Sequence, residues 1–137
     1  MKVYFACAIV GGRYDENIYQ QLVDALLADG HEVPTLMNAG PAWQHMEGSP
    51  KPSEVYRRDT RWIDESQVLI AEVSTPSHGV GYEISYALER NKPVLCIYRR
   101  GTRVSKMLTG NTMTGITVAD YGALSEAINI MRGFLSR

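Results

Sequence analysis

The sequence lacks the features that mark membrane proteins, secreted proteins and binders of polyanions. No apolar run approaches the roughly 20 residues that a membrane-spanning helix needs. The opening stretch MKVYFACAIV has one lysine before an apolar run, which is typical of a first β-strand rather than of a signal peptide. The formal net charge is only -1, so a general nucleic-acid-binding surface is not expected. We therefore expect a cytoplasmic protein with no membrane or nucleic-acid partner.

Cysteine and histidine are also scarce, with two and three residues respectively. Cys7 and Cys96 lie in apolar, strand-like runs without CxxC spacing, so we expect both to be buried as small apolar side chains. The histidines are scattered along the chain rather than paired at ligand spacing. Neither a metal site nor another cofactor is predicted.

What the chain does contain is enough apolar material for one core. Its 137 residues are 45% hydrophobic, which favours a single domain over residues 1–137. Nearly continuous apolar runs predict buried strands, and two weaker segments predict two more. The five predicted strands are 2–9, 31–36, 67–73, 93–98 and 115–120.

Helical patterns alternate with these strands. Ile18, Leu22 and Leu26 repeat at helical spacing after Asp15, the predicted N-cap, and Gly30 is the predicted C-cap. Further helices are predicted over 53–65, 80–91 and 121–136. This alternation predicts an α/β fold, a flavodoxin-like or Rossmann-like three-layer sandwich with a five-stranded parallel sheet. The segment 37–52, with Trp43 inside it, is predicted to be a long functional or mobile loop.

The loop TPSHGVGYE, residues 75 to 83, follows a buried strand and leads into a helix, the usual place of a ligand crevice in a parallel sheet. Gly79 and Gly81 would allow close backbone approach and positive φ, and the helix N-terminus with Ser77 would favour an anion such as phosphate. The helix dipole would keep Glu83 ionised in the first turn. The alternative is that Glu83 is an ordinary glutamate on a solvated face.

A second carboxylate is placed unusually. Helical spacing puts Asp59 on the apolar stripe of Val55, Tyr56, Trp62 and Ile63, where an unpaired carboxylate is costly. A structural ion pair with a nearby arginine is the alternative, although those charges are predicted on other faces. Two carboxylates at one crevice, beside a phosphate-seeking loop, suit cleavage of a glycosidic bond. Glu72, near the end of a strand, is a weaker third candidate.

The stretch RRGTRVSK, residues 99 to 106, follows the fourth buried strand and gathers basic side chains around Ser105. A solvated charge run is the simple interpretation. The alternative is that this segment lies at the rim of the crevice, where its basic groups and hydroxyl would complement a monophosphate.

Taken together and in order, YFACAIVGGR, RRDTRWIDESQVLIAEV, TPSHGVGYE and RVSKM resemble the 2′-deoxynucleoside 5′-monophosphate N-glycosidases. These belong to the nucleoside 2-deoxyribosyltransferase-like superfamily, and the similarity covers nearly the whole chain. The resemblance implies hydrolysis of the N-glycosidic bond of a (2′-deoxy)nucleoside 5′-monophosphate to free base and (deoxy)ribose 5-phosphate, through a covalent glycosyl-enzyme and without a cofactor.

The resemblance also implies the parts that single residues play. Glu83 matches the nucleophile, Asp59 matches the carboxyl group that assists base departure, and Tyr4 matches the tyrosine that orients the nucleophile. Ser77 and Gly79 match phosphate ligands. Substrate binding is further implied for Ile9 and Gly11 and for Ser105, which would reach the phosphate from the neighbouring subunit of a homodimer.

Two further features of the sequence refine this implication. The loop TPSHGVG has no acidic residue where the related transferases place one near the sugar 5′-hydroxyl, which favours a nucleotide over a nucleoside. Val10 and Cys7 depart from the arginine and glycine of many relatives, and Tyr4 favours the deoxy sugar. Base exchange by a nucleoside 2-deoxyribosyltransferase and nucleotide binding without catalysis remain alternative functions.

Overall fold

A computed structural model describes residues 1–9, 12–35 and 51–137 of the chain. Its sheet is parallel, with the strands in the spatial order β1-β2-β3-β4. The strands are β1 (Val3–Ala6), β2 (Val68–Glu72), β3 (Val94–Arg99) and β4 (Ile116–Tyr121). The prediction of a parallel α/β sheet is confirmed, but the number of strands is four in the described residues rather than five.

The fifth strand was predicted at residues 31 to 36, of which the structure describes 31–35. In this described part, the pairing with the β1 side of the sheet is a single parallel bridge between Glu32 and Lys2. Pro34 follows, and a proline has no N–H for a ladder. The hydroxyl of Thr35 takes over instead: it accepts from Phe5 N at 3.0 Å and donates to Phe5 O at 2.7 Å. The Thr35 side chain therefore provides hydrogen bonds to the Phe5 N–H and C=O groups, which a fifth strand beside β1 would otherwise have bonded.

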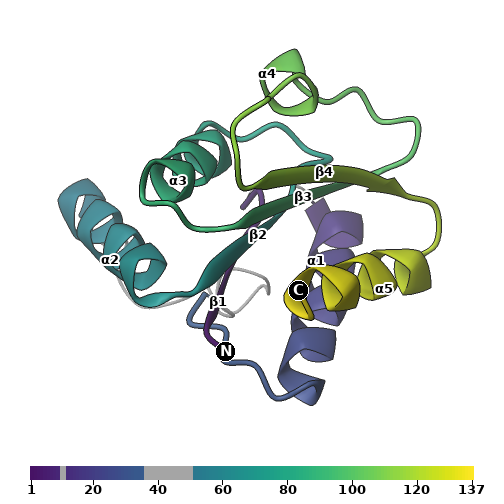
Figure 1. Cartoon of the computed structure of the whole chain (residues 1–137), viewed down its shortest axis with the longest axis horizontal. Coiled ribbons are helices and arrows are strands. Elements are labelled where there is room, and N and C mark those ends of the chain that lie inside the picture. Colours follow the sequence, from purple (N-terminus) through teal and green to yellow (C-terminus); the bar gives the residue numbers. More distant parts are fainter. Residues whose placement is uncertain (10–11, 36–50) are drawn as a thin grey trace.

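Helices cover both faces of the sheet (Figure 1). They are α1 (Gly12–Ala28), α2 (Pro52–Glu65), α3 (His78–Glu89), the short α4 (Lys106–Thr109) and α5 (Leu124–Leu135). One core cluster lies between the sheet and α1 with α5, and the other lies between the sheet and α2 with α3. Cys7 belongs to the first cluster and Cys96 to the second, and both are buried thiols outside any disulfide, as predicted.

The ends of the helices differ in detail from the prediction. Helix α1 begins at Gly12, so Asp15 lies inside its first turn and is not the N-cap. Gly30 has a φ of 88° and follows the last turn of α1, as expected for a C-cap glycine. Helix α4, which the sequence pattern did not predict, begins after Ser105.

The connections after β1 and β2 diverge to opposite faces of the sheet. The chain that leaves β1 passes to α1 on one face, whereas the chain that leaves β2 passes to α3 on the other (Figure 1). At such a switch point the loops after the two strands separate, and open α/β sheets bind ligands there. In the part of the chain described, no helix has the length and apolar character needed to cross a membrane.

Candidate active site

A pocket of about 620 Å³ occupies this switch point. Its walls come from the end of β1, from the inner side of α2 and from the beginning of α3. The lining includes Phe5, Ala6, Cys7 and Ile9, then Val55, Tyr56, Asp59 and Ile63, and finally Ser77, Gly79, Val80, Tyr82 and Glu83. We call this space the carboxylate pocket, because the two predicted acids, Asp59 and Glu83, both line it.

Glu83 lies in the second turn of α3 and is only partly exposed. Burial raises its pKa to about 7, and the nearby charge of Asp59 acts in the same direction, against the hydrogen bond from Tyr4 and the charge of Arg58. The helix begins at His78, so Glu83 lies about one turn further along it than predicted. Burial there disfavours the ionised form and opposes the predicted effect of the helix dipole.

Tyr4, on β1, contacts the Glu83 carboxyl group from the side of the sheet. Its position on β1 directs it to the face covered by α2 and α3, and its hydroxyl donates a hydrogen bond to Oε2 of Glu83. Burial, followed by the charges of Glu83 and Asp59, raises the pKa of Tyr4 far above its ordinary value. The phenol therefore stays a hydrogen-bond donor across the whole working range of pH.

Asp59 reaches the carboxylate pocket from α2. Burial raises its pKa, and this effect is opposed by Arg58, whose Nε donates to Oδ1 of Asp59 at 2.9 Å. The expectation that neighbouring arginines point away from Asp59 is thus wrong for Arg58. Sequence spacing did not reveal this contact, because consecutive residues on a helix normally face different directions.

The predicted phosphate loop has a different backbone from the one expected. Gly79 and Gly81 lie inside α3 and neither has a positive φ. Ser77 is the N-cap, and its Oγ accepts from Val80 N at 3.3 Å. Ser77, Gly79 and Ile9 all line the carboxylate pocket. The N–H groups of the first turn, including that of Gly79, have no intrahelical acceptor and point toward the helix start. Gly11, Val10 and Trp43 lie outside the described residues.

Ser105 lies apart from the carboxylate pocket of its own chain. It caps α4, accepting from Met107 N at 3.1 Å. With Arg103 and Ser77 it lines a neighbouring pocket of about 450 Å³ between α3 and α4. Ser77 is thus shared by the two pockets, whereas Ser105 does not reach Asp59 or Glu83.

Two arginines of the predicted basic rim have structural partners instead. Arg99 binds Asp15, with 2.9 Å between Nη1 and Oδ1, and Arg100 pairs with Asp120 and Glu126. For Arg99 and Arg100 these ion pairs favour the simple interpretation over the alternative of a phosphate-binding rim.

Glu72, the weaker third candidate, lies on the opposite face of the sheet. Alternation along β2 directs it to the side of α1 and α5. Its Oε1 accepts from Ser74 N at 2.7 Å, and Oε2 accepts from Ser74 Oγ and from the hydroxyl of Tyr121. Glu72 is a buried and satisfied carboxylate that does not join the carboxylate pocket.

Residues that the sequence pattern missed also line or adjoin the pocket. Tyr56 and Tyr82 stand at its mouth with their hydroxyl oxygens 3.1 Å apart. Within the described ranges, no three His, Cys, Asp or Glu side chains gather as metal ligands would.

Comparison with known proteins assigns this chain to a family. The nucleoside 2-deoxyribosyltransferase family model matches residues 3–128 of the chain. The protein belongs to this family, and the resemblance identified from the sequence is confirmed.

Individual relatives carry more specific names. A protein of Methanococcoides burtonii named as a 2′-deoxynucleoside 5′-phosphate N-hydrolase is 38% identical over 122 residues, which cover 89% of this chain and 100% of that protein. The 5-hydroxymethyl-dUMP N-hydrolase of Danio rerio is 36% identical over 137 residues, covering 98% and 95%. The structure of a CMP N-glycosidase from Clostridium botulinum has a similar fold, with a TM-score of 0.72 at 18% identity, covering 96% of this chain and 99% of that one.

Proposed function

We propose that the protein hydrolyses the N-glycosidic bond of (2′-deoxy)nucleoside 5′-monophosphates and releases the free base and (deoxy)ribose 5-phosphate. The observation that carries this proposal is that Glu83 and Asp59 line one switch-point pocket and that the Tyr4 hydroxyl donates a hydrogen bond to Glu83. The names of the relatives support the same reaction.

The chemistry uses the two carboxyl groups in turn. An oxygen of ionised Glu83 attacks the anomeric carbon while the bond from that carbon to the base nitrogen breaks. The bonding electrons leave with the base, which takes a proton from the carboxyl group of Asp59. The resulting ester between Glu83 and the sugar is then opened by water, whose proton returns to Asp59.

The surroundings of the carboxyl groups suit this sequence of steps. A Glu83 pKa of about 7 makes the carboxylate available at neutral pH and keeps it basic enough to be an effective nucleophile. The Tyr4 hydroxyl holds one oxygen, Oε2, so that the other is free to attack. A raised pKa for Asp59 suits a group that must carry a proton to the base.

The phosphate of the substrate is assigned to the beginning of α3. The helix N-terminus, the Ser77 hydroxyl and the close approach allowed at Gly79 favour an anion there. Gly11, and Ser105 from a second copy of the chain, are assigned to the same substrate through the family resemblance, so the functional unit proposed is a homodimer.

A panel of deoxy- and ribonucleoside monophosphates, with base release followed by chromatography, tests the proposal. We expect release of at least one base, and loss of turnover with retained nucleotide binding in Glu83→Ala. Folded protein that releases no base from any of them would contradict it. Product that forms only when an acceptor base is added would indicate a transferase, and thermal stabilisation by nucleotides without base release would indicate a binding module.

A further inference from the structure

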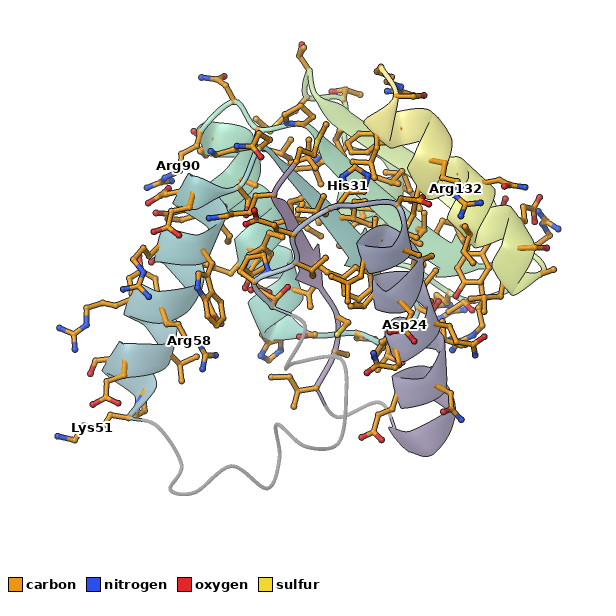
Figure 2. All side chains as sticks on the ribbon, turned by 90° about the horizontal axis from the view of Figure 1, so that it is seen from below. Asp24, His31, Lys51, Arg58, Arg90 and Arg132 are labelled. Atoms are coloured by element: carbon orange, nitrogen blue, oxygen red, sulfur yellow. The ribbon has the colours of Figure 1, made fainter. Side chains whose placement is uncertain are left out.

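Arg58 is the basic residue that directly contacts a carboxyl group of the pocket. Its Nε donates to Oδ1 of Asp59 at 2.9 Å, and its guanidinium lies over the ring of Trp62, 4.9 Å from the centroid. The side chains of Arg58 and Asp59 are 26% and 18% exposed, so this ion pair is largely removed from water. In Figure 2, Arg58 leaves α2 on the side turned toward the rest of the molecule.

The geometry of this contact is specific. Neighbouring residues on a helix point in different directions, so the Arg58 side chain must bend along the helix to reach Asp59. Stacking on Trp62, one turn further along α2, holds it in that position. Only Oδ1 of Asp59 accepts a hydrogen bond from the described residues, so Oδ2 is left for a substrate.

The charge of Arg58 acts on both acids of the pocket. It lowers the pKa of Asp59, its direct partner, and it also lowers the pKa of Glu83 on α3 and of Tyr4 on β1. Three further titratable groups line the pocket with Glu83: the buried thiol of Cys7 and the phenols of Tyr56 and Tyr82. Arg61, on the same helix, is 67% exposed and pairs with Glu65 instead. Arg58 is thus the cation, among the described residues, that both acids of the pocket experience.

We propose that Arg58 is a positioning residue that holds Oδ1 of Asp59, so that the proton for the leaving base is presented from Oδ2, and that its charge lets Glu83 ionise beside it. The inference rests on the proposed function. Two neighbouring carboxyl groups do not both ionise easily, and the reaction needs the charge on Glu83 and the proton on Asp59. The hydrogen bond from Nε to Oδ1 leaves Oδ2 to carry that proton, and the same cation lowers the pKa of Glu83. At Asp59 burial outweighs the cation, so the pKa of Asp59 stays raised.

The pH dependence of kcat/KM tests this inference with two variants. Arg58→Met keeps the side-chain stem on Trp62 and removes the charge. Without the cation the pKa of Glu83 rises, so the limb along which activity increases with pH moves to higher pH. We expect roughly three- to tenfold lower kcat/KM on that limb and near-normal values above it, because an opposite charge at this range changes a carboxyl pKa by about 1 unit. Arg58→Lys should return the limb toward that of the unmodified protein.

Arg57→Gln is the matched control, because Arg57 is exposed on the same helix and lies outside the pocket. A profile for Arg58→Met that is lowered equally at every pH would make Arg58 a packing residue only. A higher KM with an unmoved profile would make it a substrate ligand. Either result overturns the inference. If the unmodified protein releases no base at all, the proposed function fails instead, so the two failures are distinguished.

Discussion

The surroundings of one side chain, Glu83, control how the pocket responds to pH. Burial raises its pKa and the Tyr4 hydroxyl lowers it, so Tyr4 partly offsets the cost of ionising a carboxyl group away from water. A nucleophilic carboxylate needs both effects on its pKa. Without the hydrogen bond from Tyr4, buried Glu83 would remain protonated to higher pH. A fully hydrated Glu83 would be a weaker base.

Replacing Tyr4 with phenylalanine removes that donor and leaves the ring in place. The pKa of Glu83 should rise above about 7, so activity at acidic pH should fall roughly tenfold or more, because a hydrogen bond to a charged group contributes about 1.5 to 3 kcal/mol. The measurement is kcat/KM against pH. Tyr86→Phe is the control, since its hydroxyl donates to Asp64 outside the pocket. An unmoved acidic limb would show that Tyr4 does not tune Glu83.

The same residue should make stability depend on pH. The pKa of Glu83 is about 7 in the folded protein against 4.5 for an unperturbed glutamate, so the folded state binds the proton more tightly. This stabilising contribution is complete below the unfolded pKa and is lost as the pH rises through about 7. Ionised Glu83 therefore costs folding free energy at alkaline pH.

Glu83→Gln removes this cost. Its free energy of unfolding, relative to the unmodified protein, should increase between pH 5 and pH 8 by on the order of 2 kcal/mol. Urea denaturation at the two pH values measures the difference. Glu89→Gln, an exposed position on the same helix, is the control. A difference that stays constant with pH would mean that Glu83 is not buried as the structure places it.

At the scale of elements, one buried carboxylate ties three segments together at the carboxyl edge of the sheet. Asp15 of α1 accepts from Thr75 Oγ1 at 2.7 Å and from Arg99 Nη1 at 2.9 Å. Thr75 belongs to the loop that ends in the N-cap Ser77, and Arg99 ends β3. The loop that leads into α3 is therefore held by a hydrogen bond to Asp15 of α1, a helix on the opposite face of the sheet.

Asp15→Asn should destabilise the fold by about 2 to 4 kcal/mol, since removing one charge of a buried pair leaves the other uncompensated. The loss is limited because Glu72 lies 3.8 Å from the same Arg99 nitrogen. Denaturant unfolding measures it, with Asp24→Asn, exposed on the same helix, as the control. A loss of stability no larger than that of the control would show that the contacts of Asp15 with Thr75 and Arg99 do not stabilise the fold.

The sequence predicted the elements well where a pattern repeats along the chain. Among the described residues, continuous apolar runs located β1, β2 and β3, and a weaker segment located β4. Helical spacing located every described helix except α4, including the stripe that carries Asp59. The misses depend on contacts that no repeat encodes. The Thr35 hydroxyl takes the place of backbone hydrogen bonds that a fifth strand would have made with β1. Helix α4 is too short to show a helical repeat of apolar residues.

The candidate site shows the same division. Unusual placement indicated Glu83 and Asp59, and the resemblance to a family added Tyr4 to them. An ion pair between Asp59 and a nearby arginine was left open as an alternative, without a choice of Arg58, and the pairing of Arg99 with Asp15 was missed. Each depends on how a long side chain bends, and that choice is made by packing in three dimensions rather than by position along the chain.

At the scale of the whole molecule, the pocket of about 450 Å³ between α3 and α4 is apolar and open to solvent in the described part of the chain. Apolar side chains of α3 and of the segment that follows Ser105 line it, and Met107 is 82% exposed beside it. Monomeric proteins seldom leave such a surface in contact with water, so a second copy of the chain is the occupant that the proposed homodimer requires. That arrangement would allow Ser105 to serve a site that its own chain does not reach.

Mixing two impaired variants tests whether Ser105 acts across subunits. Glu83→Gln and Ser105→Ala should each be impaired alone at low substrate concentration. In a mixed dimer one site carries both changes and the other carries neither, so an equal mixture allowed to exchange subunits should regain about a quarter of the normal activity by statistics. If Ser105 serves its own chain, every site keeps one defect and mixing restores nothing. Base release from the mixture, with each variant alone as the control, separates the two arrangements.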